Sequence, residues 1–171
     1  MRSSDEVEFL MFFNRDLLIR RREEFNNLGV RFHFLGNLDD EKIPVENKVL
    51  MSETEKQTSS NIKLNLVFAF NYGSRDEVHK SIEKFMNDHD SNVNVELVSD
   101  KFRNYMYIPS MPDPDLLIRT AGEQRLSNFL LYQLSYTELM FFKTLWPEFC
   151  EDELNQAVEE FSKRKRTYGK A

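Results

Sequence analysis

The sequence of 171 residues contains little cysteine, glycine or proline. Its single cysteine, Cys150, excludes an intramolecular disulfide framework and any zinc site that needs several cysteines. Five glycines and five prolines provide few points at which regular structure must stop, so the helices and strands should be long. No internal repeat or low-complexity tract divides the chain, and a single domain over residues 1–171 is expected.

Long hydrophobic runs and an excess of basic residues are also lacking. The longest apolar run in a strand-like segment covers residues 66–70, whereas a membrane-spanning helix needs roughly 20 residues. Asp5, Glu6 and Glu8 interrupt the region where a signal peptide would have its apolar core. With 23 Lys and Arg against 29 Asp and Glu, the net charge of −6 argues against a nucleic-acid partner. We therefore expect a cytoplasmic protein that at most associates with a membrane surface.

Hydrophobic residues make up 40% of the chain and aromatic residues 13%, which is enough for a substantial core. The hydrophobic periodicity predicts strands that alternate with helices. This alternation predicts an α/β fold with a largely parallel sheet flanked by helices. The expected helices lie at residues 3–29, 44–57, 74–87, 100–106 and around 154–161, and the expected strands at 30–35, 62–70, 116–119 and 138–142.

In two of these segments the apolar pattern also predicts which side chains are buried. In residues 62–70 the alternate positions are apolar, and the intervening positions become apolar toward the C-terminal end. This pattern is typical of an interior strand in a sheet covered on both faces. In the helix that Pro44 opens, Val45, Val49 and Met51 are the candidate apolar contacts.

The chemistry-bearing segment follows the short strand at residues 116–119. Arg119, Glu123, Arg125 and Ser127 come directly after it, and ligands of parallel sheets bind just beyond the C-terminal ends of strands. Two guanidinium groups and a hydroxyl suit a diphosphate, because arginine binds phosphate oxygens bidentately and stays charged. The same composition also fits a surface cluster of ion pairs, so these residue types alone leave both readings open.

The order of the residues in and after this segment also resembles the motifs of a known family. Residues 115–133 read Asp-Leu-Leu-Ile-Arg-Thr-Ala-Gly-Glu-Gln-Arg-Leu-Ser-Asn-Phe-Leu-Leu-Tyr-Gln, followed by Tyr-Thr-Glu-Leu at 136–139 and Leu-Trp-Pro-Glu-Phe at 145–149. This stretch closely resembles the last signature block of the cis-prenyltransferases, the family of undecaprenyl and dehydrodolichyl diphosphate synthases. Residues 71–75, Asn-Tyr-Gly-Ser-Arg, resemble the family's turn between a strand and a helix. The resemblance covers essentially the whole chain.

The resemblance implies a fold, a reaction and partners. The family joins isopentenyl diphosphate to an allylic diphosphate, making a cis-polyprenyl diphosphate that serves as the precursor of a lipid glycosyl carrier. It implies Mg²⁺ as the cofactor, which neutralises the departing diphosphate, and a homodimer. Carried over position by position, it assigns substrate binding to Arg2, Arg119, Arg125, Leu126 and Ser127, and a metal-associated role to Glu138.

Structural roles stand beside several of these assignments. Arg2 could be a terminal arginine in solvent, and Glu138 could form a structural salt bridge. Glu123 is expected to orient Arg119 or Arg125 rather than touch the substrate. A set of apolar residues could line a tunnel for the growing polyprenyl chain or pack as ordinary core: Phe9, Phe12, Phe13, Leu17, Phe32, Phe34, Leu64 and Leu66.

The chain also departs from the family pattern. Ser74 and Ala121 replace glycines, and Thr167 stands where many members carry arginine. The family's opening Met-Asp-Gly-Asn-x-Arg-Trp and its later Ser-x-Glu-Asn-Trp have no match, and residues 1–7 resemble the sequence that follows the second motif. We therefore expect the N-terminal strand-helix-strand unit and the catalytic aspartate to be missing. No catalytic residue is assigned, and the chain alone is expected to have little or no turnover.

Two other functions remain open from the sequence. One is a noncatalytic partner subunit, or a remnant, of a heteromeric cis-prenyltransferase. Such partners usually lose the arginine-rich loop that this chain retains. The other is an α/β protein that binds some phosphorylated ligand without catalysis. The basic run from Lys163 to Arg166 fits a solvated end, or contact with anionic lipid headgroups or with the diphosphate of the product.

Overall fold

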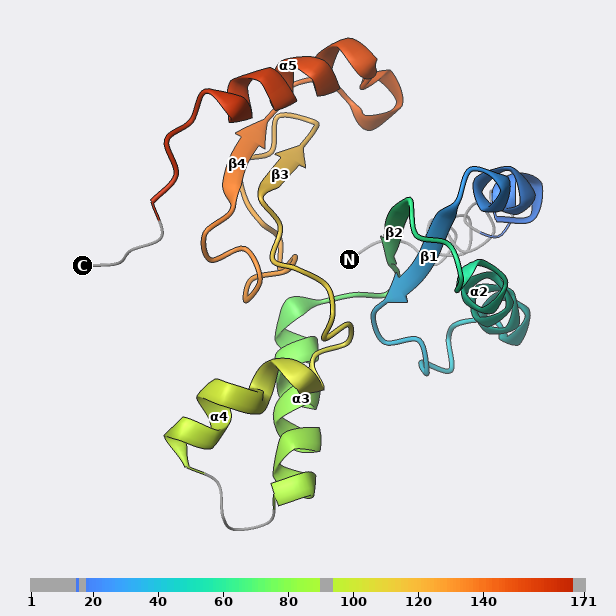
Figure 1. The fold of residues 1–171 in the computed structure, drawn as a ribbon, viewed down its shortest axis with the longest axis vertical. Helices are drawn as coiled ribbons and strands as arrows, with labels where there is room; N and C mark the ends of the chain where they lie inside the picture. Colours follow the sequence, from blue (N-terminus) through green and yellow to red (C-terminus); the bar gives the residue numbers. More distant parts are fainter. Residues whose placement is uncertain (1–14, 16–17, 90–93, 168–171) are drawn as a thin grey trace. The chain divides into compact units, whose positions relative to one another are not determined.

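The computed structural model describes residue 15, residues 18–89 and residues 94–167 (Figure 1). The chain forms two compact units, Met1–Tyr72 and Gly73–Ala171, named here the N-terminal unit and the C-terminal unit. None of the described helices is long and apolar enough to cross a membrane.

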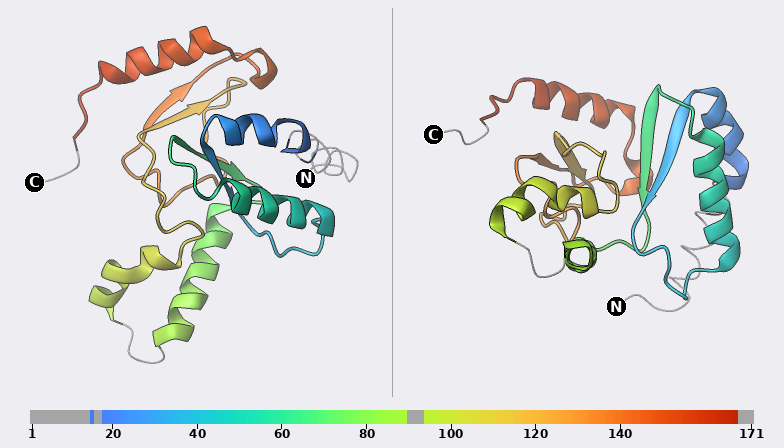
Figure 2. Two further views of the ribbon diagram at one scale, coloured as in Figure 1. Left: turned by 45° about the vertical axis from the view of Figure 1, so that its right-hand side comes forward. Right: turned by 60° about the horizontal axis from the view of Figure 1, so that its bottom comes forward.

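The N-terminal unit is a two-stranded parallel sheet covered by helices. β1 (Val30–Leu35) pairs with β2 (Leu64–Ala69), and the register places Phe34 beside Phe68. The helix that ends at residue 27 and α2 (Val45–Thr58) lie on the same face of this sheet (Figure 2). Gly29 follows the first of these helices with φ of +78°, the left-handed conformation that commonly ends a helix.

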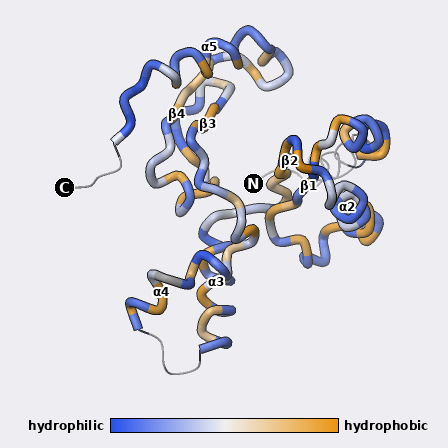
Figure 3. Tube along the Cα trace, in the orientation of Figure 1, coloured by the Kyte–Doolittle hydropathy of each residue, from blue (hydrophilic) through white to orange (hydrophobic). Residues whose placement is uncertain are grey.

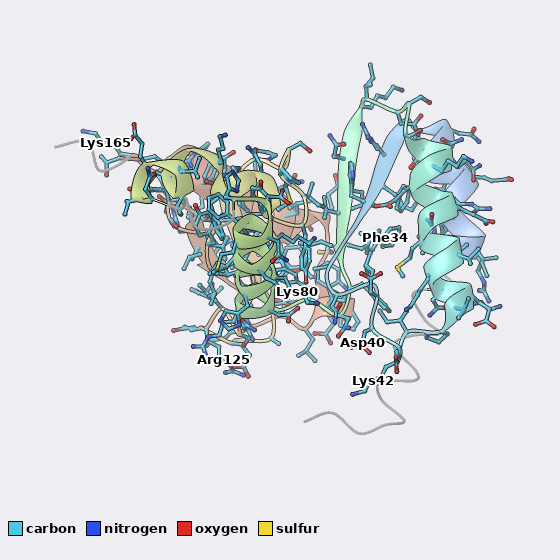
Figure 4. The ribbon with its side chains drawn as sticks, turned by 90° about the horizontal axis from the view of Figure 1, so that it is seen from below. Phe34, Asp40, Lys42, Lys80, Arg125 and Lys165 are labelled. Atoms are coloured by element: carbon cyan, nitrogen blue, oxygen red, sulfur yellow. The ribbon has the colours of Figure 1, made fainter. Side chains whose placement is uncertain are left out.

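Aromatic rings fill the space between this sheet and its helices. Phe32 and Phe34 occupy alternate positions of β1, so both side chains lie on the same face. Both rings stack on Phe68, with centroids 5.9 and 5.8 Å apart. Figure 4 shows Phe34 between the sheet and α2. The buried cluster comprises Leu18, Val30, Phe32, Phe34, Ile43 and Met51.

Side chains of α2 satisfy main-chain donors on one edge of β1. Thr58 Oγ1 accepts a hydrogen bond from the Phe32 N–H at 3.1 Å, and Glu55 Oε1 accepts one from the Phe34 N–H at 2.8 Å. Buried N–H groups need such acceptors. α2 therefore provides acceptors at this edge that a neighbouring strand would otherwise provide.

The described part of the C-terminal unit contains a second parallel strand pair, three α-helices and two 3-10 helices. β3 (Leu116–Arg119) pairs with β4 (Glu138–Phe141), and α5 (Glu151–Ser162) lies beside them. α5 is mainly hydrophilic (Figure 3), and its buried residue is Ala157. α3 (Ser74–His89) packs through the Phe85 ring on the rings of Phe102 and Tyr105, which belong to the 3-10 helix η1. The remaining elements are α4 (Val95–Lys101), η1 (Phe102–Tyr105) and η2 (Trp146–Glu148).

Both strand pairs are parallel, and each is flanked by helices of its own unit, so the α/β fold class is confirmed. The predicted positions of β1, α2, α3, β3, β4 and α5 agree with the structure within a few residues. The short helix expected at residues 100–106 corresponds to the 3-10 helix η1, but the α-helix α4, which begins at Val95 and runs directly into it, was not expected. There the side chain of Asn94 accepts a hydrogen bond from the Leu97 N–H at 2.8 Å and caps the helix.

Two burial predictions are also wrong. Met51 is buried as expected, but Val45 and Val49 are 71% and 50% exposed, because they lie on the solvent side of α2. Within the described residues β2 pairs only with β1, and Leu64 is 55% exposed, so β2 is not an interior strand. An apolar pattern shows which side chains could be buried, but it does not show that a covering neighbour exists.

Candidate functional site

Arg119 stands at the C-terminal end of β3. The parallel pairing with β4 fixes this end, because the Phe142 N–H donates to the Arg119 carbonyl oxygen at 2.8 Å. The chain then turns sharply through Ala121 and Gly122, with φ of +66° and +70°. The N–H groups of these two residues donate to the carbonyl oxygens of Thr144 and Phe142, both at 2.8 Å. The turn directs the following residues, 123–128, back toward Arg119.

The structure brings Arg119 and Ser127 into direct contact and ties Arg125 to the same loop. Arg119 Nη1 donates to Ser127 Oγ at 3.1 Å and also to the main-chain carbonyl oxygen of Arg125. The Arg125 guanidinium forms an ion pair with Glu123 and is 63% exposed. Figure 4 shows Arg125 at the surface of the unit. Glu123 therefore pairs with one of the two arginines named in the sequence analysis.

The two arginines differ in how their charges are compensated. Glu123 offsets the charge of Arg125. No carboxylate in the described part of the chain pairs with Arg119, whose hydrogen bonds go to a hydroxyl and a carbonyl oxygen. A guanidinium that is oriented by neutral acceptors keeps its positive charge available to an anionic ligand.

A cavity of about 400 Å³ adjoins this group. Arg119, Arg125 and Ser127 are its ionic and hydroxyl-bearing lining residues. The rest of the lining is apolar: Pro114, Leu116, Leu117, Ile118, Leu126, Phe129, Leu130 and Leu134. Leu126, which the resemblance assigns to substrate binding, is one of these apolar residues, and its role toward a substrate stays a prediction. A pocket with an apolar lining and two guanidinium groups suits a small ligand with a hydrocarbon part and a phosphate part.

The loop after Ser127 is tied to the first turn of α3, which the sequence analysis did not foresee. The Asn128 carbonyl oxygen accepts from the Ser74 N–H at 2.9 Å, and Asn128 Oδ1 accepts from the Arg75 N–H at 3.0 Å. Further along the loop, Gln133 Nε2 donates to the buried Glu77 carboxylate at 3.1 Å. Asn128 lies inside the recognised motif, so its position was visible, but no local pattern indicated its partner.

Glu138 begins β4 and forms an ion pair with Arg164. Its Oε2 atom lies 2.7 Å from Arg164 Nη1, and both side chains are less than one third exposed. Hydrogen bonds to Glu138, and then to Glu160, raise the pKa of the Arg164 guanidinium. The salt bridge that was the structural alternative for Glu138 is therefore present, while its role toward a metal stays a prediction.

The described residues offer few ligands for Mg²⁺. No cluster of three or more His, Cys, Asp or Glu side chains among them could hold a metal ion. Magnesium in phosphate-processing sites is often held by one or two carboxylates together with phosphate oxygens. Glu138 fits such a site only if a diphosphate supplies further oxygen ligands. Its carboxylate would then contact both the metal ion and Arg164.

The remaining assigned residues lie elsewhere. Arg2 lies outside the described residues, as do Phe9, Phe12, Phe13 and Leu17. Phe34 lines a small cavity of about 50 Å³ in the N-terminal unit, whereas Leu64 is 55% exposed. Near the C-terminus, Arg166 pairs with Asp115 at 2.6 Å.

Comparisons with known proteins find relatives in the family that the sequence motifs resemble. The model of the undecaprenyl diphosphate synthase family matches residues 1–169. An isoprenyl transferase of Thermotoga maritima is 42% identical over 98% of this chain and 71% of its own length. A ditrans,polycis-undecaprenyl-diphosphate synthase of Micrococcus luteus is 37% identical over 98% and 68%. The lavandulyl diphosphate synthase of Lavandula x intermedia, solved with dimethylallyl diphosphate, superimposes with a TM-score of 0.90 at 30% identity, over 99% of this chain and 73% of that one.

The fold and the site define an α/β protein with an arginine-lined pocket at the C-terminal end of a parallel strand. The chain belongs to the cis-prenyltransferase family, the family of the undecaprenyl diphosphate synthases.

Proposed function

We propose that the pocket beside Arg119 binds isopentenyl diphosphate. In this proposal Arg119, Arg125 and Ser127 hold the diphosphate, and Leu126 belongs to the apolar surface that meets the five-carbon chain. The observation that carries the proposal is the Arg119 guanidinium, which neutral acceptors orient beside an apolar cavity and which no described carboxylate pairs with. Charge-assisted hydrogen bonds to a diphosphate would use that free charge.

The proposed reaction joins isopentenyl diphosphate to an allylic diphosphate. The bond between the allylic carbon and its diphosphate breaks, so that diphosphate leaves and the allylic carbon bonds to isopentenyl diphosphate. The isopentenyl part then loses a proton, which leaves a new cis double bond. Bound Mg²⁺ would supply charge neutralisation for the departing diphosphate, with Glu138 as the one assigned protein carboxylate. The residues of the C-terminal unit would bind and orient the second substrate. The product would be a cis-polyprenyl diphosphate.

Turnover by this chain alone is a separate part of the proposal. The family's aspartate motif has no match among the 171 residues, so we expect little or no product from the purified chain. The test is incubation with Mg²⁺, an allylic diphosphate and radiolabelled isopentenyl diphosphate. Robust polyprenyl product that disappears in Arg119→Ala would show that the chain is catalytically competent.

A noncatalytic subunit of a heteromeric enzyme is the second candidate, and the same unmatched motif favours it. The retained arginine-rich loop argues against it, because substrate-binding residues are not required in a subunit that only supports a partner. Binding of isopentenyl diphosphate by the purified chain would favour the first candidate.

The decisive experiment is calorimetric titration of isopentenyl diphosphate into the wild type, Arg119→Ala and Arg125→Ala. Each charge-assisted hydrogen bond is worth roughly 1.5–3 kcal/mol, so each variant should bind about tenfold or more weakly. Arg21→Ala is the matched control, because Arg21 is an exposed arginine of the N-terminal unit paired with Glu24. If the wild type binds and both pocket variants bind equally well, the arginines are only a surface cluster.

A further inference from the structure

We propose that Asn128 is a positioning residue that anchors the substrate-binding loop to the first turn of α3 and so holds Ser127 and Arg119 in their binding geometry. The inference rests on the proposed function of the pocket. Asn128 itself does not line the pocket, so it would act through its neighbour Ser127.

Asn128 caps a helix from a distant part of the sequence. The first N–H groups of a helix have no acceptor inside the helix and need one from elsewhere. Asn128 supplies two acceptors, its main-chain oxygen to Ser74 N–H at 2.9 Å and its Oδ1 to Arg75 N–H at 3.0 Å. A side-chain oxygen of this kind is a strong cap in the usual local arrangement. Here the same contacts also fix the loop that carries Ser127.

The backbone of this loop needs such an anchor. Ser127, Asn128 and Leu130 have φ of +48°, +65° and +45°. Left-handed conformations are common for asparagine but unfavourable for serine and leucine, so contacts outside the loop must maintain them. Besides Asn128, the Leu131 N–H donates to Ser74 Oγ at 2.9 Å. The first turn of α3 therefore holds the loop on both sides of Phe129.

Gly73 makes room for this anchor. A Cβ atom built at Gly73 would lie 2.8 Å from Asn128 Nδ2, closer than real Cβ contacts come. A side chain at the residue before α3 would therefore push the Asn128 amide away from its present place. Gly73→Ala thus disturbs the same anchor from the opposite side, without changing the loop sequence.

The test is isopentenyl diphosphate affinity, measured by calorimetry on the full chain, with Asn128→Gly as the main variant. Glycine accepts the φ of +65°, so this change removes the side-chain acceptor without adding backbone strain. We expect binding up to about tenfold weaker, the change that loss of one hydrogen bond can cause, and a similar loss for Gly73→Ala. Asn128→Asp keeps the acceptor at a helix N-terminus and should bind within about threefold of the wild type.

Asn94→Gly is the matched control, because it removes an asparagine cap from α4 of the same unit, at a helix that does not line the pocket. The proposal is overturned if Asn128→Gly binds as well as the wild type, or no more weakly than Asn94→Gly at equal loss of melting temperature. It is also overturned if Asn128→Asp binds as weakly as Asn128→Gly. If one of these results is obtained and Arg119→Ala still loses binding, the role of Asn128 is refuted but the proposed function of the pocket stands. A wild type that does not bind would instead remove the proposed function, and this inference with it.

Discussion

At the scale of single residues, Ala121 holds a backbone conformation that suits glycine better. Its φ of +66° lies in the left-handed region, which costs an L-residue roughly 1–2 kcal/mol. Glycine avoids this strain but loses about 0.5–1 kcal/mol through its more flexible unfolded state. Ala121→Gly should therefore raise the free energy of unfolding by about 0.5–1 kcal/mol, measured by urea denaturation.

Gly122 provides the opposite substitution in the same turn. Its φ is +70°, and a Cβ atom there would meet nothing within 4 Å. Gly122→Ala should therefore lower the free energy of unfolding through backbone strain alone. A turn that is equally stable with alanine or glycine at both positions would contradict this account of residues 121 and 122.

The residues of the site show how far sequence can reach. Arg119, Arg125, Leu126 and Ser127 could be grouped from the sequence, because they follow one strand within nine residues and carry the family motif. The anchoring role of Asn128 could not be found in this way. Its partners are 53 and 54 residues earlier in the chain, and their proximity depends on packing that no local pattern encodes.

At the scale of elements, Thr58 joins α2 to β1. Its side chain is fully buried, its hydroxyl donates to the Thr54 carbonyl oxygen at 2.8 Å, and it accepts from the Phe32 N–H. Thr58→Val keeps the shape but leaves that buried N–H without an acceptor. The free energy of unfolding should fall by about 1–3 kcal/mol in denaturant titration.

Thr58→Ser is the control for this prediction, because it keeps the hydroxyl and loses only a methyl group. It should cost less than Thr58→Val. The reverse order would mean that the hydrophobic contact of the methyl group, and not the hydrogen bond, stabilises this junction.

The start of α5 should make stability depend on pH. The Thr144 hydroxyl and then the Cys150 N–H donate to the Glu153 carboxylate and lower its pKa below the ordinary value of a glutamate. A carboxyl whose pKa is lower in the folded state adds stability above its unfolded pKa and loses it as pH falls through its folded pKa. The wild type should therefore lose more stability than Glu153→Gln on acidification below about pH 4.5.

This pH dependence is read from thermal unfolding by circular dichroism at a series of pH values. The two Glu153 oxygens accept one hydrogen bond each, from the Thr144 hydroxyl and from the Cys150 N–H, and glutamine can keep only one of the two through its single amide oxygen. This loss lowers the stability of Glu153→Gln at every pH. Because glutamine does not titrate in this range, the pH-dependent part of the difference between the two proteins reports the carboxylate. Parallel curves for wild type and variant from neutral to acidic pH would show that Glu153 contributes no titrating stability.

Element boundaries were predictable where a residue type dictates them. Pro44 and Gly29 marked the start of one helix and the end of another within a residue or two. The start of α4 was not predictable in the same way, because Asn92 and Asn94 are equally good caps by composition.

At the scale of the whole molecule, we expect a homodimer. In the C-terminal unit Tyr136, Leu145 and Trp146 are 60%, 54% and 74% exposed, and they flank or follow β4. A twofold interface would bury the same patch on both subunits. Light scattering at high micromolar concentration should give the dimer mass, and Trp146→Glu should shift it toward the monomer. A wild type that remains monomeric at that concentration would contradict the prediction.

The acceptors that α2 provides to β1 give the N-terminal sheet a direction of growth. A strand of another chain could not pair with the Phe32 and Phe34 N–H groups, because both already donate to side chains of α2. Among the described residues β2 pairs only with β1, so its other edge is the one at which a further strand could pair. Any strand addition to this sheet is therefore limited to the β2 edge, which is where a charged substitution would oppose it.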